Sequence, residues 1–139
     1  MIDRLPRPRV LLVEDDENDV LFFQRAVRGC GAQLDLEVVR DGDRAVQRLS
    51  RGDLPDRIVL DLKLPRRSGL EVLSWIRSNP SLSHLSVTIL TSSGEPSDLS
   101  RIQELGIEEY IVKPVSYQAL LDIVRTLCRN WKVATLPPP

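Results

Sequence analysis

The sequence is poor in the residues that build disulfide frameworks and cysteine–histidine metal sites. It contains two cysteines and one histidine, His84, in 139 residues. We expect His84 to be a loop residue. Cys30 and Cys128 are too few for a disulfide framework or a metal cluster, so we expect free thiols in a reducing compartment. No apolar run is long enough to span a bilayer, and residues 1–9 lack the apolar region of a signal peptide. We therefore expect a cytoplasmic protein with no membrane partner.

A strong positive charge is also absent. The formal net charge is -1, and Arg66 and Arg67 are the only adjacent basic pair. Domains that bind nucleic acid usually concentrate basic residues on one face, so we expect no nucleic-acid partner. Hydrophobic residues make up 42% of the chain and charged residues 28%, an ordinary balance for a domain with its own core.

Five short apolar runs alternate with helix-length segments. Runs of this length that are rich in branched residues are typical of buried parallel strands. The predicted strands are Arg9 to Val13, Leu36 to Val39, Arg57 to Leu60, Ser86 to Leu90 and Glu109 to Val112. The predicted helices are Asp16 to Arg28, Gly42 to Arg51, Gly69 to Asn79, Glu95-Pro96 to Gly106, and a last helix capped by Ser116. Short, right-handed connections then favour an α/β fold, a doubly wound parallel sheet with helices on both faces.

The pattern predicts one folded unit. We assign residues 9–131 to the domain, residues 1–8 to an N-terminal tail and residues 132–139 to a C-terminal extension. The extension ends in three prolines, which cannot continue a helix. We expect no second domain.

Polar residues follow four of the apolar runs at the point where each run stops. In an open parallel sheet, the carboxyl ends of the strands form the crevice where ligands bind. Carboxylates suit a hard cation such as Mg²⁺, and a hydroxyl and a lysine suit a phosphoryl group. The residues are Glu14-Asp15-Asp16, Asp61, Thr91-Ser92 and Lys113-Pro114.

Asp61 is the strongest single candidate. A carboxylate that ends a fully apolar run is costly unless it is paired or bound, and it can form an aspartyl-phosphate. Asp15 and Asp61 can supply two carboxylates to Mg²⁺, with Glu14 acting through a water. Each residue also has a simpler interpretation; the acidic triplet, for example, could only complement a helix dipole. Agreement among four strand ends favours the functional interpretation.

The chain resembles the receiver domain of two-component response regulators over nearly its whole length, from about Arg9 to Trp131. The resemblance implies a flavodoxin-like fold with strand order 2-1-3-4-5. It also implies a signalling protein, not an enzyme, that takes a phosphoryl group from a sensor histidine kinase. The motifs that carry it are Leu11-Leu12-Val13-Glu14-Asp15-Asp16, Leu60 to Pro65 with Ser68-Gly69, Leu90-Thr91-Ser92 and Tyr110-Ile111-Val112-Lys113-Pro114.

The resemblance assigns a role to each site residue. Asp61 is the phosphoacceptor, and the implied Mg²⁺ ligands are Glu14, Asp15, Asp61 and the backbone carbonyl of Lys63. Thr91 and Lys113 bind the phosphoryl group, and Thr91 and Tyr110 form the switch. The Lys113–Pro114 bond is expected to be cis, which only proline tolerates readily. Asp16 and Ser92 are expected to contact these residues without binding the metal or the phosphoryl group themselves. Lys63 and Ser92 are expected near the attacking water, where they would influence hydrolysis of the phosphoryl group.

The C-terminus, from Arg129-Asn130-Trp131 onward, resembles stand-alone receivers that partner bacterial phytochrome-type histidine kinases. Trp131, Val133 and Leu136 follow the last helix with no further domain to pack against. Clustered exposed apolar residues often mark an interface. We therefore expect a homodimer through the fourth helix, fifth strand and fifth helix, with the tail reaching across. The alternative is a tail folded back on its own subunit.

Other functional classes fit less well. A haloacid-dehalogenase-type phosphatase needs a second aspartate two residues after its nucleophile, where this chain has Lys63, and its nucleophile follows the first strand. A flavodoxin-like cofactor binder would need a phosphate loop rich in glycine and serine or threonine after the first strand, and no such loop follows the first strand of this sequence. A receiver-like module that works without phosphorylation would lack one of the residues that bind the metal or the phosphoryl group, and none of these residues is missing from the sequence.

Overall fold

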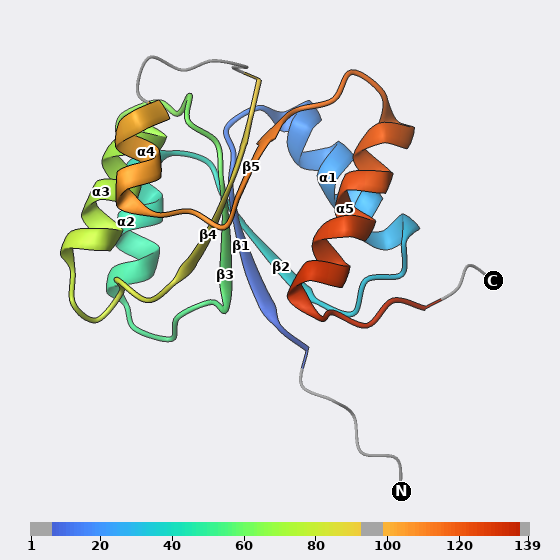
Figure 1. Ribbon diagram of the computed structural model, residues 1–139, viewed down its shortest axis with the longest axis horizontal. Helices are drawn as coiled ribbons and strands as arrows, with labels where there is room; N and C mark the ends of the chain where they lie inside the picture. Colours follow the sequence, from blue (N-terminus) through green and yellow to red (C-terminus); the bar gives the residue numbers. More distant parts are fainter. Residues whose placement is uncertain (1–6, 93–98, 137–139) are drawn as a thin grey trace, which may run out of the picture.

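The computed structural model describes residues 7–92 and 99–136, in which five parallel strands alternate with five helices (Figure 1). The strand order is β2-β1-β3-β4-β5, as the resemblance implied. The strands are β1 (Arg9–Val13), β2 (Asp35–Val39), β3 (Arg57–Leu60), β4 (Ser86–Thr91) and β5 (Glu109–Val112). The helices are α1 (Glu17–Gly29), α2 (Gly42–Ser50), α3 (Gly69–Ser78), α4 (Leu99–Leu105) and α5 (Tyr117–Trp131). The predicted start of the fourth helix, Glu95-Pro96, lies outside the described residues.

Helices cover both faces of the sheet, with α1 and α5 on one face and α2, α3 and α4 on the other (Figure 1). Side chains alternate between the two faces along a strand. On β1, Val10 and Leu12 accordingly pack into the core beneath α1 and α5, whereas Leu11 and Val13 pack beneath the other three helices. The central strands therefore read as unbroken apolar runs because both of their faces are buried.

Polar caps fix where four helices begin. Asp16, Asp41, Ser68 and Ser116 each accept a hydrogen bond from the backbone N–H three residues later. Such caps satisfy one of the unpaired donors in the first turn of a helix. Helices α1, α3 and α5 thus start directly after the loops that follow β1, β3 and β5. No helix among the described residues has the length and apolar character that a bilayer crossing requires.

The C-terminal segment folds back on its own subunit. Trp131 and Val133 are each 8% exposed and belong to the core between α1 and α5. The segment then pairs with the α1–β2 loop, where Gln33 N–H donates to Ala134 O at 2.8 Å and Leu136 N–H donates to Gly31 O at 2.9 Å. The expectation that the tail reaches across to a partner is wrong for residues 132–136, and the alternative of a tail folded back on its own subunit is confirmed for them, because the end of α1 and the loop after it provide a packing surface.

Gly69 brings the loop after β3 against the end of that strand. A Cβ atom at this position would lie 2.2 Å from the carbonyl oxygen of Asp61 and 2.6 Å from Cα of Leu62. Gly69 N–H also donates to Leu62 O at 3.0 Å. The start of α3 is therefore tied to the backbone that carries Asp61.

Candidate functional site

The strand ends hold the predicted site residues in place through backbone hydrogen bonds one residue beyond the strands. Asp61 N–H donates to Val13 O at 3.1 Å, and Lys113 N–H donates to Thr91 O at 2.7 Å. Glu14 N–H likewise donates to the carbonyl oxygen of Val39, the last residue of β2, at 3.0 Å. The backbone N–H groups of these three residues therefore continue the hydrogen bonding of the sheet just beyond the strands.

Three carboxylates meet at this edge of the sheet. Glu14, Asp15 and Asp61 each offer an oxygen, and these oxygens all lie within 4.8 Å of one another. Glu14 and Asp61 are buried, whereas Asp15 is exposed. Close carboxylates repel one another, and hard divalent cations prefer oxygen ligands. The donor set therefore fits a cation such as Mg²⁺.

The ammonium group of Lys113 is surrounded by carboxylates. Its Nζ lies 2.6 Å from Glu14 Oε1, 2.8 Å from Asp19 Oδ2 and 3.0 Å from Asp61 Oδ2. Lys113 therefore does not occupy the surface position of an ordinary lysine. It places one fixed positive charge among the acids.

Burial and charge shift the ionisation of this cluster. Burial raises the pKa of Glu14 from 4.5 to about 7; the hydrogen bonds from Lys113 and the Asp16 N–H act in the opposite direction. For Lys113, burial alone lowers the pKa, but its hydrogen bonds with Asp19, Glu14 and Asp61 outweigh that effect and raise it. Lys113 is therefore charged at neutral pH, and Glu14 lies near the midpoint of its titration.

Two of the predicted phosphoryl-binding and switch residues, Thr91 and Tyr110, lie on β4 and β5. Thr91, at the end of β4, is fully buried, and the next residue, Ser92, is exposed. Tyr110 on β5 is half-buried and packs against the core under α2, α3 and α4. Lys63 N–H donates to Asp61 Oδ1 at 3.3 Å, which places the Lys63 backbone next to the phosphoacceptor candidate. The role of the Lys63 carbonyl as a ligand stays a prediction.

Asp16 has a clear structural role. Its Oδ1 caps α1 by accepting from Asp19 N–H at 3.0 Å, and its own N–H donates to Glu14 Oε2 at 3.1 Å. Asp16 therefore supports the site by orienting Glu14 and by starting α1 at the correct place.

The predicted cis geometry of Lys113–Pro114 is wrong, because the described residues contain no cis peptide bond. A trans bond before proline is favoured by roughly 0.5–1 kcal/mol in the absence of other constraints. The long Lys113 side chain reaches the acids from a trans backbone, as its 2.6 Å contact with Glu14 shows.

A family model for the response regulator receiver domain matches residues 10–125. The chain belongs to this family. Among curated relatives, the probable methanogenesis regulatory protein FilR2 of Methanothrix harundinacea is 35% identical over 127 residues, covering 88% of this chain and 82% of FilR2.

Solved structures of response regulators, two of them named for phytochromes, resemble this receiver. The phosphorylated cyanobacterial phytochrome response regulator RcpA has a TM-score of 0.84 and 32% identity, covering 96% of this chain and all of RcpA (100%). The Mn²⁺-bound response regulator Rcp1 has a TM-score of 0.80 and 30% identity, and the match covers 94% of this chain and 99% of Rcp1. The bacteriophytochrome response regulator RtBRR has a TM-score of 0.76 and 39% identity, and the match covers 96% of this chain and 86% of RtBRR.

The protein is therefore a receiver-domain response regulator, and receivers of this kind are signalling proteins, not conventional enzymes. The alternatives of a phosphatase and a flavodoxin-like cofactor binder gain no support. In this receiver the acidic cluster is split between the ends of β1 and β3, and the residue two positions after Asp61 is Lys63.

The sequence analysis missed Asp19. It lies in the first turn of α1 and contacts Lys113, yet its position matches that of any acid that complements a helix dipole. Nothing in the local sequence distinguishes it from Glu17 two residues earlier. Only the long-range approach of Lys113 identifies it as part of the receiver site.

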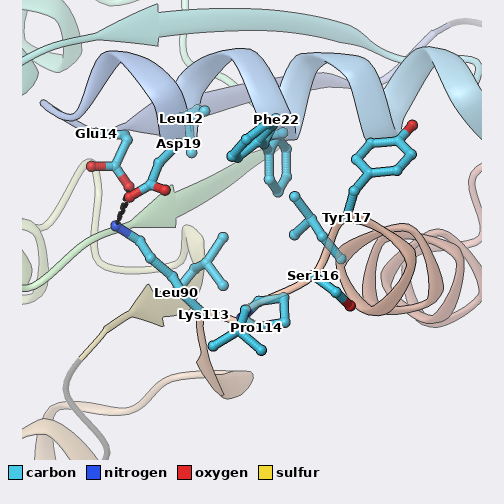
Figure 2. A pocket seen from close by; sticks show the side chains of 12 residues that line it. Leu12, Glu14, Asp19, Phe22, Leu90, Lys113, Pro114, Ser116 and Tyr117 are labelled. Carbon is cyan, nitrogen blue, oxygen red and sulfur yellow. Dashed lines mark hydrogen bonds and ion pairs between the residues drawn. The ribbon is translucent and has the colours of Figure 1, made fainter.

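A cavity of about 300 Å³ adjoins the receiver site. Figure 2 shows it between α1 and the segment that leads from β5 into α5, with Glu14, Asp19 and Lys113 at one end. Phe22 and Tyr117 line the rest of it, so one wall is polar and the remainder is largely apolar.

Proposed function

We propose that this protein accepts a phosphoryl group on Asp61 from a sensor histidine kinase, with Mg²⁺ bound by Glu14, Asp15, Asp61 and the backbone carbonyl of Lys63. The observation that carries the proposal is the position of Asp61. Its buried carboxylate belongs to the three-acid cluster and also lies 3.0 Å from Lys113 Nζ.

The strand order favours Asp61 over Glu14 as the phosphoacceptor. β3 lies between β1, which carries the acidic pair, and β4, which ends in Thr91. A phosphoryl group on Asp61 would thus have acids for a cation on one side and a hydroxyl donor on the other. Glu14 lies one strand farther from Thr91, and its carboxylate already accepts from Asp16 and Lys113.

The chemistry requires little beyond positioning and charge. An Asp61 carboxylate oxygen would attack the phosphorus of a phosphohistidine, forming an O–P bond as the N–P bond breaks and its electron pair returns to the imidazole. Lys113 and Thr91 would donate hydrogen bonds to the phosphoryl oxygens. Mg²⁺, when bound, would offset the charge of the acids and of the incoming group.

Phosphorylation adds about 1.5 to 2 negative charges and new acceptor oxygens. We propose that Thr91 moves toward the phosphoryl group and that Tyr110 turns inward, altering the face formed by α4, β5 and α5. We also propose that Ser92, which follows Thr91, and Lys63 influence the attack of water on the phosphoryl group. A charge change of this kind can bias a two-state surface.

We further propose a phytochrome-type histidine kinase as the partner. RcpA, Rcp1 and RtBRR support it, because two of them are named for phytochromes and all three align over most of this chain.

Two free cysteines, both buried, are consistent with a cytoplasmic location.

We also propose a homodimer through α4, β5 and α5. β5 is an edge strand, its Val112 is 45% exposed, and a groove of about 500 Å³ lined by β5 and α5 runs beside it. Light scattering at tens of micromolar, with and without beryllofluoride, tests this assembly. A monomer under both conditions would exclude the dimer.

Labelling with a small phosphoryl donor tests the proposed function. With Mg²⁺ and acetyl phosphate, wild type should gain one phosphoryl group by intact mass or a Phos-tag gel, and Asp61→Asn should gain almost none. Asp122→Asn is the matched control, because it makes the same chemical change at an exposed position on α5. Equal labelling of wild type and Asp61→Asn would reject the assignment.

A further inference from the structure

We propose that Asp19 is a positioning residue that competes with the phosphoryl group on Asp61 for the ammonium of Lys113, and so limits how tightly the site holds that group. The proposal rests on the phosphoacceptor site described above. Asp19 Oδ2 lies 2.8 Å from Lys113 Nζ, and the Asp19 side chain is 37% exposed at the wall of the cavity (Figure 2).

Lys113 has no donor to spare in this arrangement. An ammonium group carries three N–H donors. Three carboxylate oxygens, from Glu14, Asp19 and Asp61, lie within 3.0 Å of Nζ. A phosphoryl oxygen can therefore gain a hydrogen bond from Lys113 only if one of these acids releases it.

The three acids differ in what happens when the site fills. Glu14 and Asp61 belong to the three-acid cluster, so a divalent cation competes with Lys113 for their oxygens. Phosphorylation also converts one Asp61 carboxylate oxygen into the bridging oxygen of an acyl phosphate. Asp19 lies outside that cluster, so a bound cation does not compete with Lys113 for its oxygens.

The backbone keeps Asp19 in position. Asp19 N–H donates to Asp16 Oδ1 at 3.0 Å, and Asp16 N–H donates to Glu14 Oε2 at 3.1 Å. The same cap therefore orders both Glu14 and Asp19, whose side chains point toward the ammonium end of Lys113 in Figure 2. Asp19 is thus held as a permanent competitor.

Asp19→Asn keeps the size of the side chain and removes its charge. At saturating Mg²⁺, we expect this variant to bind beryllofluoride about two- to fivefold more tightly than wild type, a size typical of one partly exposed ion pair. Calorimetry or fluorine NMR of the bound fluoride reports the affinity. Asp19→Glu restores the charge and should return the affinity to within about twofold of wild type.

Glu17→Gln is the matched control. It removes the same charge from the same helical turn, at an exposed position. It should leave beryllofluoride affinity unchanged. Binding to wild type checks the phosphoacceptor site independently, and the ratio between variants decides the role of Asp19. Weaker or unchanged binding in Asp19→Asn, or an equal gain in Glu17→Gln, would overturn the proposal.

Discussion

Lys113 Nζ lies 2.6 Å from Glu14 Oε1, so the positive charge at the end of β5 contacts the first acid after β1. The two residues are far apart in sequence and come from strands that are not neighbours in the sheet. In the absence of a cation, this lysine offsets part of the repulsion among the acids. It therefore contacts two of the carboxylates that a metal ion would bind, Glu14 and Asp61.

The first prediction follows from this competition for the acids. Asp15→Asn should weaken Mg²⁺ binding by about tenfold or more, because it removes a carboxylate that faces the cation. Lys113→Ala should keep Mg²⁺ affinity or raise it, because it removes a nearby positive charge. Titration calorimetry measures both. Unchanged affinity in Asp15→Asn would count against the ligand assignment.

The second prediction concerns pH. The pKa of Glu14 is raised by burial from 4.5 to about 7, so the folded protein binds a proton that the unfolded chain has lost. Between about pH 4.5 and 7 this difference makes stability fall as pH rises, and above about pH 7 the contribution is constant. Metal-free wild type should therefore lose stability across this range in urea titrations.

Glu14→Gln provides the control for that pH effect. The amide cannot ionise, so the decline should be largely absent in this variant. In wild type, Mg²⁺ binding should also release up to one proton near pH 6, because the cation favours ionised Glu14. A decline of equal size in Glu14→Gln would assign the effect to another group.

The third prediction tests the approach of Gly69 to the backbone of Asp61. Gly69→Ala should destabilise the protein by about 1–3 kcal/mol, because the new methyl group meets backbone atoms that cannot move away. It should also weaken beryllofluoride binding by displacing Asp61. Gly52→Ala is the comparison, since Gly52 has a φ of 84° but nothing within 4 Å of an added Cβ. Gly52→Ala should lose stability and keep the ligand response.

The fourth prediction concerns the C-terminal segment. A chain that ends after Lys132 should lose about 2–4 kcal/mol of stability, because Val133 and its contacts are removed from the core. Cys30 and Cys128, which line a pocket together with Val133 and Thr135, should then react faster with a thiol reagent. Leu136→Ala should change stability little, since this side chain is 58% exposed. Equal thiol reactivity in full-length and shortened chains would contradict the account.

Local pattern was enough to predict the strands and the site residues at their ends. Branched apolar runs give buried strands, and a carboxylate such as Asp61 at the end of one cannot be left unpaired at low cost. The meeting of Glu14 and Asp15 with Asp61 then follows from parallel strands whose carboxyl ends share one edge.

Features that depend on tertiary contacts could not be predicted in this way. The antiparallel bridge between Ala32 and Thr135 joins short segments without an alternating pattern, so the sequence could not decide between a tail that folds back and one that reaches across. The role of Asp19 depends on a lysine that arrives from the opposite end of the chain.

The most direct test of the central claim is to locate the phosphoryl group chemically. After reaction of the protein with acetyl phosphate and Mg²⁺, borohydride reduction should convert an aspartyl-phosphate to homoserine, which peptide mass spectrometry can place in the sequence. We expect homoserine at position 61 in wild type and none in Asp61→Asn. Reduction products confined to Glu14, Asp15 or Asp19, with Asp61 unmodified, would contradict it.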